Sequence, residues 1–128
     1  MKVSDVMTPY VATISPEASV REAAQLMREL DTGSLPVCEG GRLLGMVTPK
    51  DIAVRATAFG HDNDSTLVVD VMTPDVVCCY REDDVQDARR MMEESSLGKL
   101  VVLDEDRRPV GLVALSDIVR HRELRPQT

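Results

Sequence analysis

The sequence predicts an α+β fold, sandwich-like in its layering, made of two copies of one β-α-β-β-α repeat. The motif Asp5–Pro9 returns as Asp70–Pro74, 65 residues further along the chain. After a one-residue insertion, Gly45–Ile52 returns as Gly111–Ile118. Two copies are too few for a solenoid. We therefore expect two repeats that pack face to face with pseudo-two-fold symmetry.

The first half of each repeat is predicted to be a short strand followed by a helix. Residues 11–14 are apolar and predict the strand. Ser19 is suited to cap the helix, with Glu22 three residues later to complete a capping box. Asp84 and Asp87 take these two places in the second repeat. Helical spacing then predicts one apolar face, made of Val20, Ala23, Ala24, Met27 and Leu30.

The second half of each repeat is predicted to be a hairpin that runs into another helix. Residues 35–38 and 43–47 are apolar and flank the pair Gly40-Gly41, which tolerates positive φ in a tight turn. Thr48-Pro49 then begins the second helix, because proline is favoured at the first helical position. These assignments give a first repeat over 1–58, a linker over 59–67, a second repeat over 68–124 and a tail over 125–128.

Composition excludes several classes of protein. An apolar content of 43% beside 29% charged residues is typical of a globular chain, and 128 residues fit one domain or two small ones. A net charge of −7 argues against a nucleic-acid partner. The longest apolar runs are far shorter than the roughly 20 residues that cross a bilayer. The first residues lack a signal-peptide core. We expect a cytoplasmic protein with no membrane partner.

Residues suited to catalysis or metal binding are sparse. Cys38, Cys78 and Cys79 lack metal-ligand spacing, and we expect reduced thiols without a chemical role. His61 lies near two aspartates, but this local, Gly-flanked cluster is more typical of a solvated loop than of a metal site. We find no Ser/His/Asp set and no phosphate-cradling loop. The sequence therefore predicts no enzyme, no metal and no cofactor.

The turn Thr48–Asp51 is open to two interpretations. A threonine followed three residues later by aspartate is a capping box, which stabilises a helix without any ligand. A hydroxyl and a carboxylate at an exposed helix start could equally hold a sugar and its phosphate. In the second repeat Ala114 cannot cap, yet Asp117 is kept, which favours ligand contact. Ser116 could take over the capping there, so both interpretations stay open.

Taken together, the duplicated order, the two Val-Met-Thr-Pro openings, Leu35-Pro36-Val37 and the Gly45…Thr48…Asp51 turn resemble a pair of cystathionine-β-synthase (CBS) domains, or Bateman module. The similarity extends over residues 3–122. It implies a regulatory module that binds AMP, ADP, ATP or S-adenosylmethionine in clefts between the repeats. It also implies a flat dimer of modules. We expect a homodimer that acts on an effector protein unknown from this sequence.

The family also implies roles for particular residues. Its turn aspartate bonds the ribose hydroxyls, and its turn threonine or serine lies near the phosphate. These positions are Asp51 with Thr48, and Asp117 with Ala114. The adenine base is usually held by the segment before the hairpin of the opposite repeat. That assigns Gly33, Ser34 and Pro36 to the Asp117 cleft, and Gly98 and Lys99 to the Asp51 cleft.

Three basic residues are candidates for the phosphate. Lys99 stands where the family often has a basic residue, although a solvated strand end explains it equally well. Arg55 and His121 each lie one helical turn beyond an aspartate of the motif. His121 could instead favour its helix C-terminus through the dipole.

The two repeats are not equivalent. Val101 replaces Pro36 and Ala114 replaces Thr48 in the second repeat. We therefore expect unequal sites, with the Thr48/Asp51 site the better one. The predicted function is a non-catalytic sensor of an adenosine-containing ligand. The alternative is a ligand-free dimeric scaffold, which the degenerate second repeat favours and the intact first turn opposes.

Overall fold

Helices and short strands alternate along the chain, and the predicted α+β class is confirmed. The structure, a computed structural model, describes residues 1–74 and 76–124, the last five of them by backbone alone. The chain divides into two units. We call residues 12–76 the Gly45 unit, and residues 1–11 with the chain from 77 onward the Gly111 unit.

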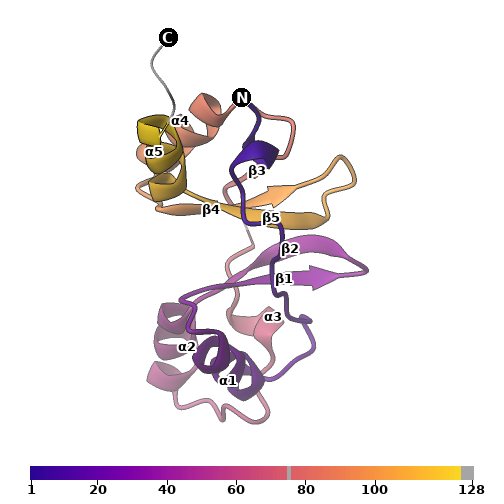
Figure 1. Cartoon of the computed structure of the whole chain (residues 1–128). Helices are drawn as coiled ribbons and strands as arrows, with labels where there is room; N and C mark the ends of the chain where they lie inside the picture. The colour runs from indigo at the N-terminus through magenta and orange to yellow at the C-terminus, as the bar shows by residue number, and fades with distance from the viewer. Residues whose placement is uncertain (75, 125–128) are drawn as a thin grey trace. The chain divides into compact units, whose positions relative to one another are not determined.

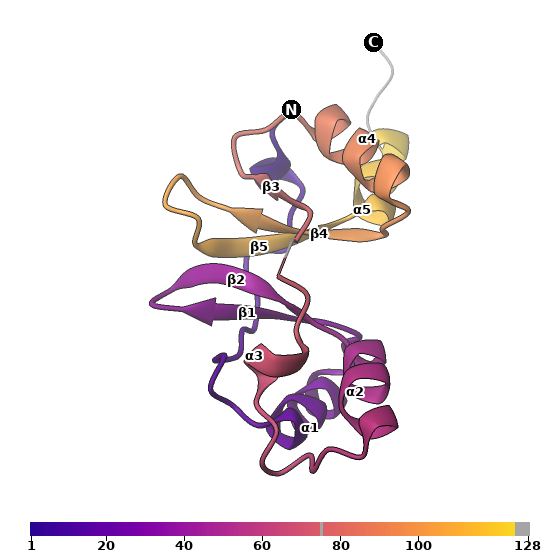
Figure 2. The same cartoon turned by 180° about the vertical axis from the view of Figure 1, so that it is seen from behind.

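The Gly45 unit is a hairpin with helices on one face (Figures 1 and 2). The strands β1 (Leu35–Glu39) and β2 (Arg42–Val47) pair antiparallel around Gly40-Gly41, whose φ angles are +60° and +82°, as predicted. Helices α1 (Val20–Leu30) and α2 (Pro49–Arg55) flank the hairpin in sequence. A 3-10 turn, η2 (Thr57–Phe59), and a short helix, α3 (Val68–Val71), follow.

The Gly111 unit is a three-stranded sheet with two helices on one face (Figure 1). The sheet order is β3 (Cys78–Tyr80), β4 (Lys99–Leu103), β5 (Pro109–Ala114). Strand β3 pairs parallel with β4, and β4 pairs antiparallel with β5. Helix α4 (Val85–Ser95) lies between β3 and β4 in sequence, and α5 (Leu115–Leu124) follows β5 directly. The first residues contribute the 3-10 turn η1 (Val3–Asp5).

The predicted helix starts are largely confirmed. The Ser19 hydroxyl accepts the N–H of Glu22 at 3.1 Å, and the Asp84 carboxylate accepts the N–H of Gln86 at 2.8 Å. Both Ser19 and Glu22 are described, and the reciprocal bond from the Ser19 N–H to the Glu22 carboxylate is not formed, so the predicted box is half made. Capping of this kind stabilises a helix by about 1 kcal/mol.

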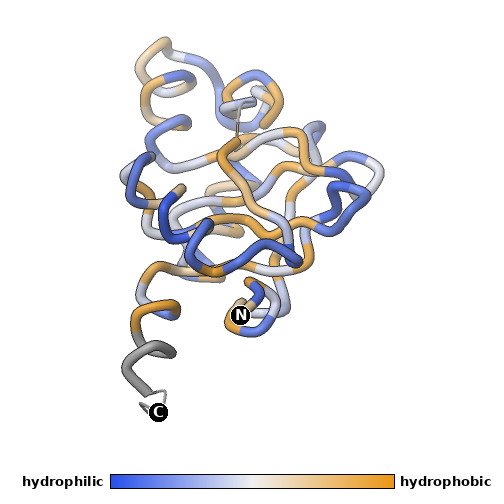
Figure 3. The backbone as a smooth tube through the Cα atoms, turned by 90° about the horizontal axis from the view of Figure 1, so that it is seen from above, coloured by the Kyte–Doolittle hydropathy of each residue, from blue (hydrophilic) through white to orange (hydrophobic). Residues whose placement is uncertain are grey.

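One apolar stripe of α1 faces the core, and it is narrower than predicted. Val20, Ala23 and Met27 are buried, whereas Ala24 and Leu30 are exposed. Figure 3 shows hydrophobic and hydrophilic segments alternating along the helical turns of the chain, as expected of helices with one buried side. Each unit has its own cluster of buried apolar side chains. Among the described residues, no helix is both long and apolar enough to cross a membrane.

The strand predicted over 11–14 is wrong. Only one parallel bridge forms, between Ile14 and Val37, whereas its counterpart β3 pairs three residues with β4. Proline has no N–H to donate to a ladder. Pro36 stands where the second repeat has Val101, the partner of Cys78, and Pro16 stands where it has Arg81, whose N–H reaches the Leu103 carbonyl at 2.9 Å. The two prolines therefore cut the ladder on both sides of Ile14.

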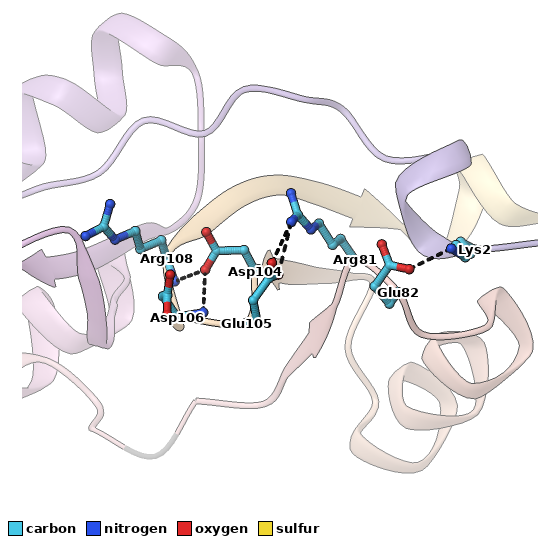
Figure 4. A network of polar contacts seen from close by, with 7 residues as sticks. All are labelled: Lys2, Arg81, Glu82, Asp104, Glu105, Asp106 and Arg108. Carbon is cyan, nitrogen blue, oxygen red and sulfur yellow. Dashed lines mark hydrogen bonds and ion pairs between the residues drawn. The ribbon is translucent and has the colours of Figure 1, made fainter.

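The opening segment of each repeat belongs to the unit built from the other repeat. At the N-terminus, Val3 donates its N–H to the Asp83 carbonyl at 2.8 Å, and Val85 donates to the Met1 carbonyl at 3.0 Å. The Lys2 ammonium pairs with Glu82 at 2.6 Å (Figure 4), which raises the pKa of Lys2 and lowers that of Glu82. Such exposed pairs stabilise little, so the backbone bonds hold this segment.

The β4–β5 loop contains the one residue by which the hairpin of the second repeat exceeds the equivalent hairpin of the first repeat. The Asp104 carboxylate accepts the N–H groups of Arg108 and Asp106 at 3.0 and 2.9 Å (Figure 4). The bond from Arg108 holds the pKa of Asp104 below its usual range. Arg107 takes a positive φ of 63° in this loop. The tight Gly40-Gly41 turn and this longer loop thus close equivalent hairpins.

A glycine on the second strand of each hairpin lets a Met-Thr-Pro segment approach the backbone of that strand closely. Met46 and Thr73 exchange backbone hydrogen bonds of 2.9 and 2.8 Å beside Gly45. A Cβ added at Gly45 would lie 2.6 Å from the Thr73 carbonyl oxygen. At Gly111 an added Cβ would collide in the same way with the Thr8 carbonyl oxygen. The glycine of the Gly-x-x-Thr-x-x-Asp motif is thus required by a close backbone approach.

We expect Gly45→Ala to lower the free energy of unfolding by about 1–3 kcal/mol, because the added methyl group forces the Thr73 segment away from β2. Gly33→Ala is the matched control in the same unit, since a Cβ there meets nothing within 4 Å. Urea denaturation of both variants and the wild type measures the difference. Equal stability of Gly45→Ala and Gly33→Ala would contradict the close approach.

Candidate functional site

The Thr48–Asp51 turn joins β2 to α2 and forms the predicted capping box. The Thr48 hydroxyl accepts the N–H of Asp51 at 3.1 Å, and the Asp51 Oδ2 atom accepts the N–H of Thr48 at 3.0 Å. Thr48 has extended backbone angles and Pro49 occupies the first helical turn. Both site residues are half-buried. The capping interpretation is therefore confirmed. A ligand role for the same residues is compatible with it and stays a prediction.

Thr73 is the residue of this site that the sequence analysis missed. Its hydroxyl donates to the Asp51 Oδ1 atom at 3.3 Å. Its one sequence signal is that Thr73 belongs to the repeated Val-Met-Thr-Pro segment. That segment served only to mark the repeat, because nothing in the sequence shows which strand it lies beside.

The Asp51 carboxylate is arranged to accept further donors. Among the described residues each oxygen accepts one hydrogen bond, and a carboxylate has about four acceptor positions. Each oxygen therefore has the capacity to accept one more. Two adjacent hydroxyl groups, as on a ribose, match this pair of acceptors.

Arg55 lies one turn beyond Asp51 on α2 and holds the segment that carries Thr73. Its guanidinium donates to the carbonyls of Met72 at 3.0 Å and Val71 at 3.4 Å. It also lines a cavity of about 340 Å³. The other lining residues are His61, Ser65, Thr66, Asp70 and Val71. A phosphate contact by Arg55 stays a prediction.

The counterpart turn in the Gly111 unit is built differently. Helix α5 begins at Leu115, whose N–H donates to the Gly98 carbonyl at 2.9 Å. Ala114 has no hydroxyl to cap it. Asp117 is half-buried, and among the described residues its carboxylate receives no hydrogen bond. The two turns therefore differ in their local hydrogen bonding, and unequal binding at them stays a prediction.

The remaining predicted site residues lie near one turn or the other within their own units. Leu35 pairs with Val47, so the buried Pro36 lies on β1 beside the α2 start, and Gly33 and Ser34 lie just before that strand. Lys99 is exposed and pairs with Ala114, which places it and Gly98 at the start of α5. The side chain of His121 lies outside the described residues. Base contacts across the repeats stay a prediction.

The thiols are poorly suited to chemistry. Burial raises the pKa of Cys79 to about 12, and it also raises the pKa of Cys38 and of Cys78. A protonated thiol is a weak nucleophile and a weak metal ligand. Among the described residues, no three His, Cys, Asp or Glu side chains group closely enough to hold a metal ion. His61 is exposed, and its ring stacks on Phe59 with centroids 6.1 Å apart.

Comparison with known proteins defines the class. The CBS domain model matches twice, over residues 3–56 and 68–123. The chain therefore belongs to the CBS domain family and carries a pair of these domains, as its repeats predicted. It is 40% identical over 116 residues to the CBS domain-containing protein YhcV of Bacillus subtilis, covering 91% of this chain and 81% of YhcV.

Solved structures of CBS pairs are also similar. The crystal structure of Hypoxic Response Protein I with two coordinated zinc ions has a TM-score of 0.84 at 31% identity, covering 94% of this chain and 98% of that one. CBSX2 in complex with AMP has a TM-score of 0.81 at 26% identity, covering 95% and 96%. The CBS pair of MJ0100 with 5′-methylthioadenosine and S-adenosylmethionine has a TM-score of 0.77 at 26% identity, covering 96% of each chain.

We expect Thr48→Ala to lower the free energy of unfolding by about 1 kcal/mol, because it removes the hydroxyl that caps α2. Thr48→Ser keeps that hydroxyl and should stay within about 0.5 kcal/mol of the wild type. Urea denaturation of the ligand-free proteins measures both. A Thr48→Ala variant as stable as Thr48→Ser would show that the capping box contributes nothing.

Proposed function

We propose that this chain is a non-catalytic regulatory module that binds an adenosine-containing ligand at the Asp51 turn. The observation that carries the proposal is the Asp51 carboxylate, held on one oxygen by the Thr48 N–H and on the other by the Thr73 hydroxyl. Similar CBS pairs bound to AMP, or to 5′-methylthioadenosine and S-adenosylmethionine, support the ligand class.

In this proposal the ribose diol of the ligand donates to the two free acceptor positions of Asp51. The Thr48 hydroxyl lies nearest to the ligand's phosphate or sulfonium tail. Arg55 and Lys99 are the candidate phosphate contacts and Gly98 is the candidate base contact at this turn, whereas Gly33, Ser34, Pro36 and His121 are the candidates at the Asp117 turn. Asp117 offers a second, weaker position, because among the described residues its carboxylate receives none of the supporting bonds that Asp51 receives.

The proposed output is a shift between conformations of the module. A ligand shifts such an equilibrium only by the difference in its affinity for the two states. The matched region is a part of longer proteins in some relatives: it spans only 23% of an inosine-5′-monophosphate dehydrogenase of Korarchaeum cryptofilum, at 40% identity. Such partial coverage is expected if the CBS pair is a regulatory domain attached to a separate catalytic domain in that relative. Homodimerisation, cytoplasmic location and the effector protein stay predictions of the sequence.

Thermal unfolding with AMP, ADP, ATP and S-adenosylmethionine tests the proposal. At a ligand concentration 100-fold above its Kd, binding adds about 2.7 kcal/mol of stability, which raises the midpoint of a chain of this size by roughly 8 °C. Asp51→Ala should abolish most of that rise, and Asp117→Ala little of it, each measured against its own ligand-free midpoint. 2′-Deoxy-AMP should stabilise the wild type less than AMP does.

Two outcomes would point elsewhere. If none of the four compounds shifts the wild-type midpoint, the dimeric scaffold takes the place of the sensor. If Asp117→Ala removes the rise while Asp51→Ala keeps it, the module binds its ligand at the other turn.

A further inference from the structure

We propose that Thr73 is a positioning residue that sets the affinity of the Asp51 site for ribose hydroxyls. The proposal rests on the proposed function and assigns a role to a residue outside the Gly-x-x-Thr-x-x-Asp motif. Thr73 is the donor that fixes the second oxygen of the Asp51 carboxylate. With the Thr48 N–H on the first oxygen, the carboxylate cannot turn about its terminal bond without losing a hydrogen bond.

The backbone that carries the Thr73 hydroxyl is itself restrained. Thr73 exchanges two hydrogen bonds with Met46, of 2.8 and 2.9 Å, and its carbonyl packs against Gly45. Arg55 holds the preceding carbonyl, that of Met72, at 3.0 Å. The side chain is half-buried. A donor on so restrained a segment orients its acceptor before any ligand arrives, and such preorganisation raises affinity by reducing the cost of ordering.

The second repeat provides an internal comparison. Thr8 corresponds to Thr73 and exchanges equivalent backbone bonds with Leu112, of 2.8 and 3.0 Å. Among the described residues, however, the Thr8 hydroxyl donates no hydrogen bond to the Asp117 carboxylate. Thr73 and Thr8 thus share the same backbone pairing, but among the described residues only Thr73 bonds to the aspartate of its turn. Thr8 is therefore a matched control, alike in sequence and backbone pairing and different in the proposed role.

Calorimetric titration with AMP tests the proposal on four proteins: wild type, Thr73→Val, Thr73→Ser and Thr8→Val. The hydrogen bond of 3.3 Å is long for an O–H···O pair, so a modest loss is expected. Thr73→Val should weaken AMP binding by about 3- to 10-fold, the range expected for the net value of one hydrogen bond. Thr73→Ser and Thr8→Val should both stay within about 2-fold of the wild type. Thr73→Ala removes the same hydroxyl without added bulk and carries the same expectation if Thr73→Val fails to fold.

A second ligand separates positioning from a merely structural effect. If Thr73 acts through Asp51 on the ribose hydroxyls, Thr73→Val and wild type should bind 2′,3′-dideoxy-AMP, which lacks both hydroxyls, with nearly equal affinity, whereas a general loss of structure would weaken both nucleotides alike. In an Asp51→Ala background, Thr73→Val should have no further effect, since the two residues act as one unit.

The outcomes are distinguishable from those of the proposed function. Wild-type binding of AMP with an unchanged affinity in Thr73→Val would overturn the positioning role and leave the proposed function standing. Equal losses in Thr73→Val and Thr8→Val would overturn it as well, because the backbone arrangement and not the hydroxyl would then matter. A wild type that binds none of AMP, ATP and S-adenosylmethionine would overturn both proposals.

Discussion

The close approach of a Met-Thr-Pro segment to a glycine on an outer strand is the contact on which both units depend. At Gly45 the Thr73 carbonyl oxygen would lie 2.6 Å from any added Cβ, and Gly111 stands in the same relation to Thr8. This approach lets Thr73 pair with Met46 and Thr8 pair with Leu112. It therefore anchors the opening of each repeat in the unit formed by the other repeat, and the chain cannot be cut at the repeat boundary without losing these bonds.

The same contact brings a threonine to the strand–helix turn, where the two units diverge. In the Gly45 unit Thr48 caps α2, and Asp51 accepts from both Thr48 and Thr73. In the Gly111 unit Ala114 removes the cap. A duplicated scaffold has thus kept its backbone pairing in both copies while the side-chain bonding has changed in one. The capping box and the proposed ligand role of Asp51 are compatible, because the bond from the Thr48 N–H that belongs to the box also orients the carboxylate.

Most of the fold could be predicted from sequence because local signals agree with tertiary packing. Ser19, Asp84 and Thr48 cap the helices they were expected to cap, and Gly40-Gly41 makes the expected turn. The prediction of a strand over 11–14 is wrong because a ladder there would need backbone N–H donors at positions 16 and 36. Both positions are proline, which has no N–H, and Pro36 is distant in sequence. Asp51 and Thr48 could be found from spacing. Thr73 could not, because its contact with Asp51 spans 22 residues and follows from the packing at Gly45.

The most direct test of the account is a crystal structure of the chain grown with saturating AMP. The account predicts that both ribose hydroxyls lie within about 2.5–3.0 Å of the two carboxylate oxygens of Asp51, with the Thr73 hydroxyl still bonded to one of them. AMP bound at Asp117 with the Asp51 turn empty, or bound with its ribose turned away from Asp51, would contradict it.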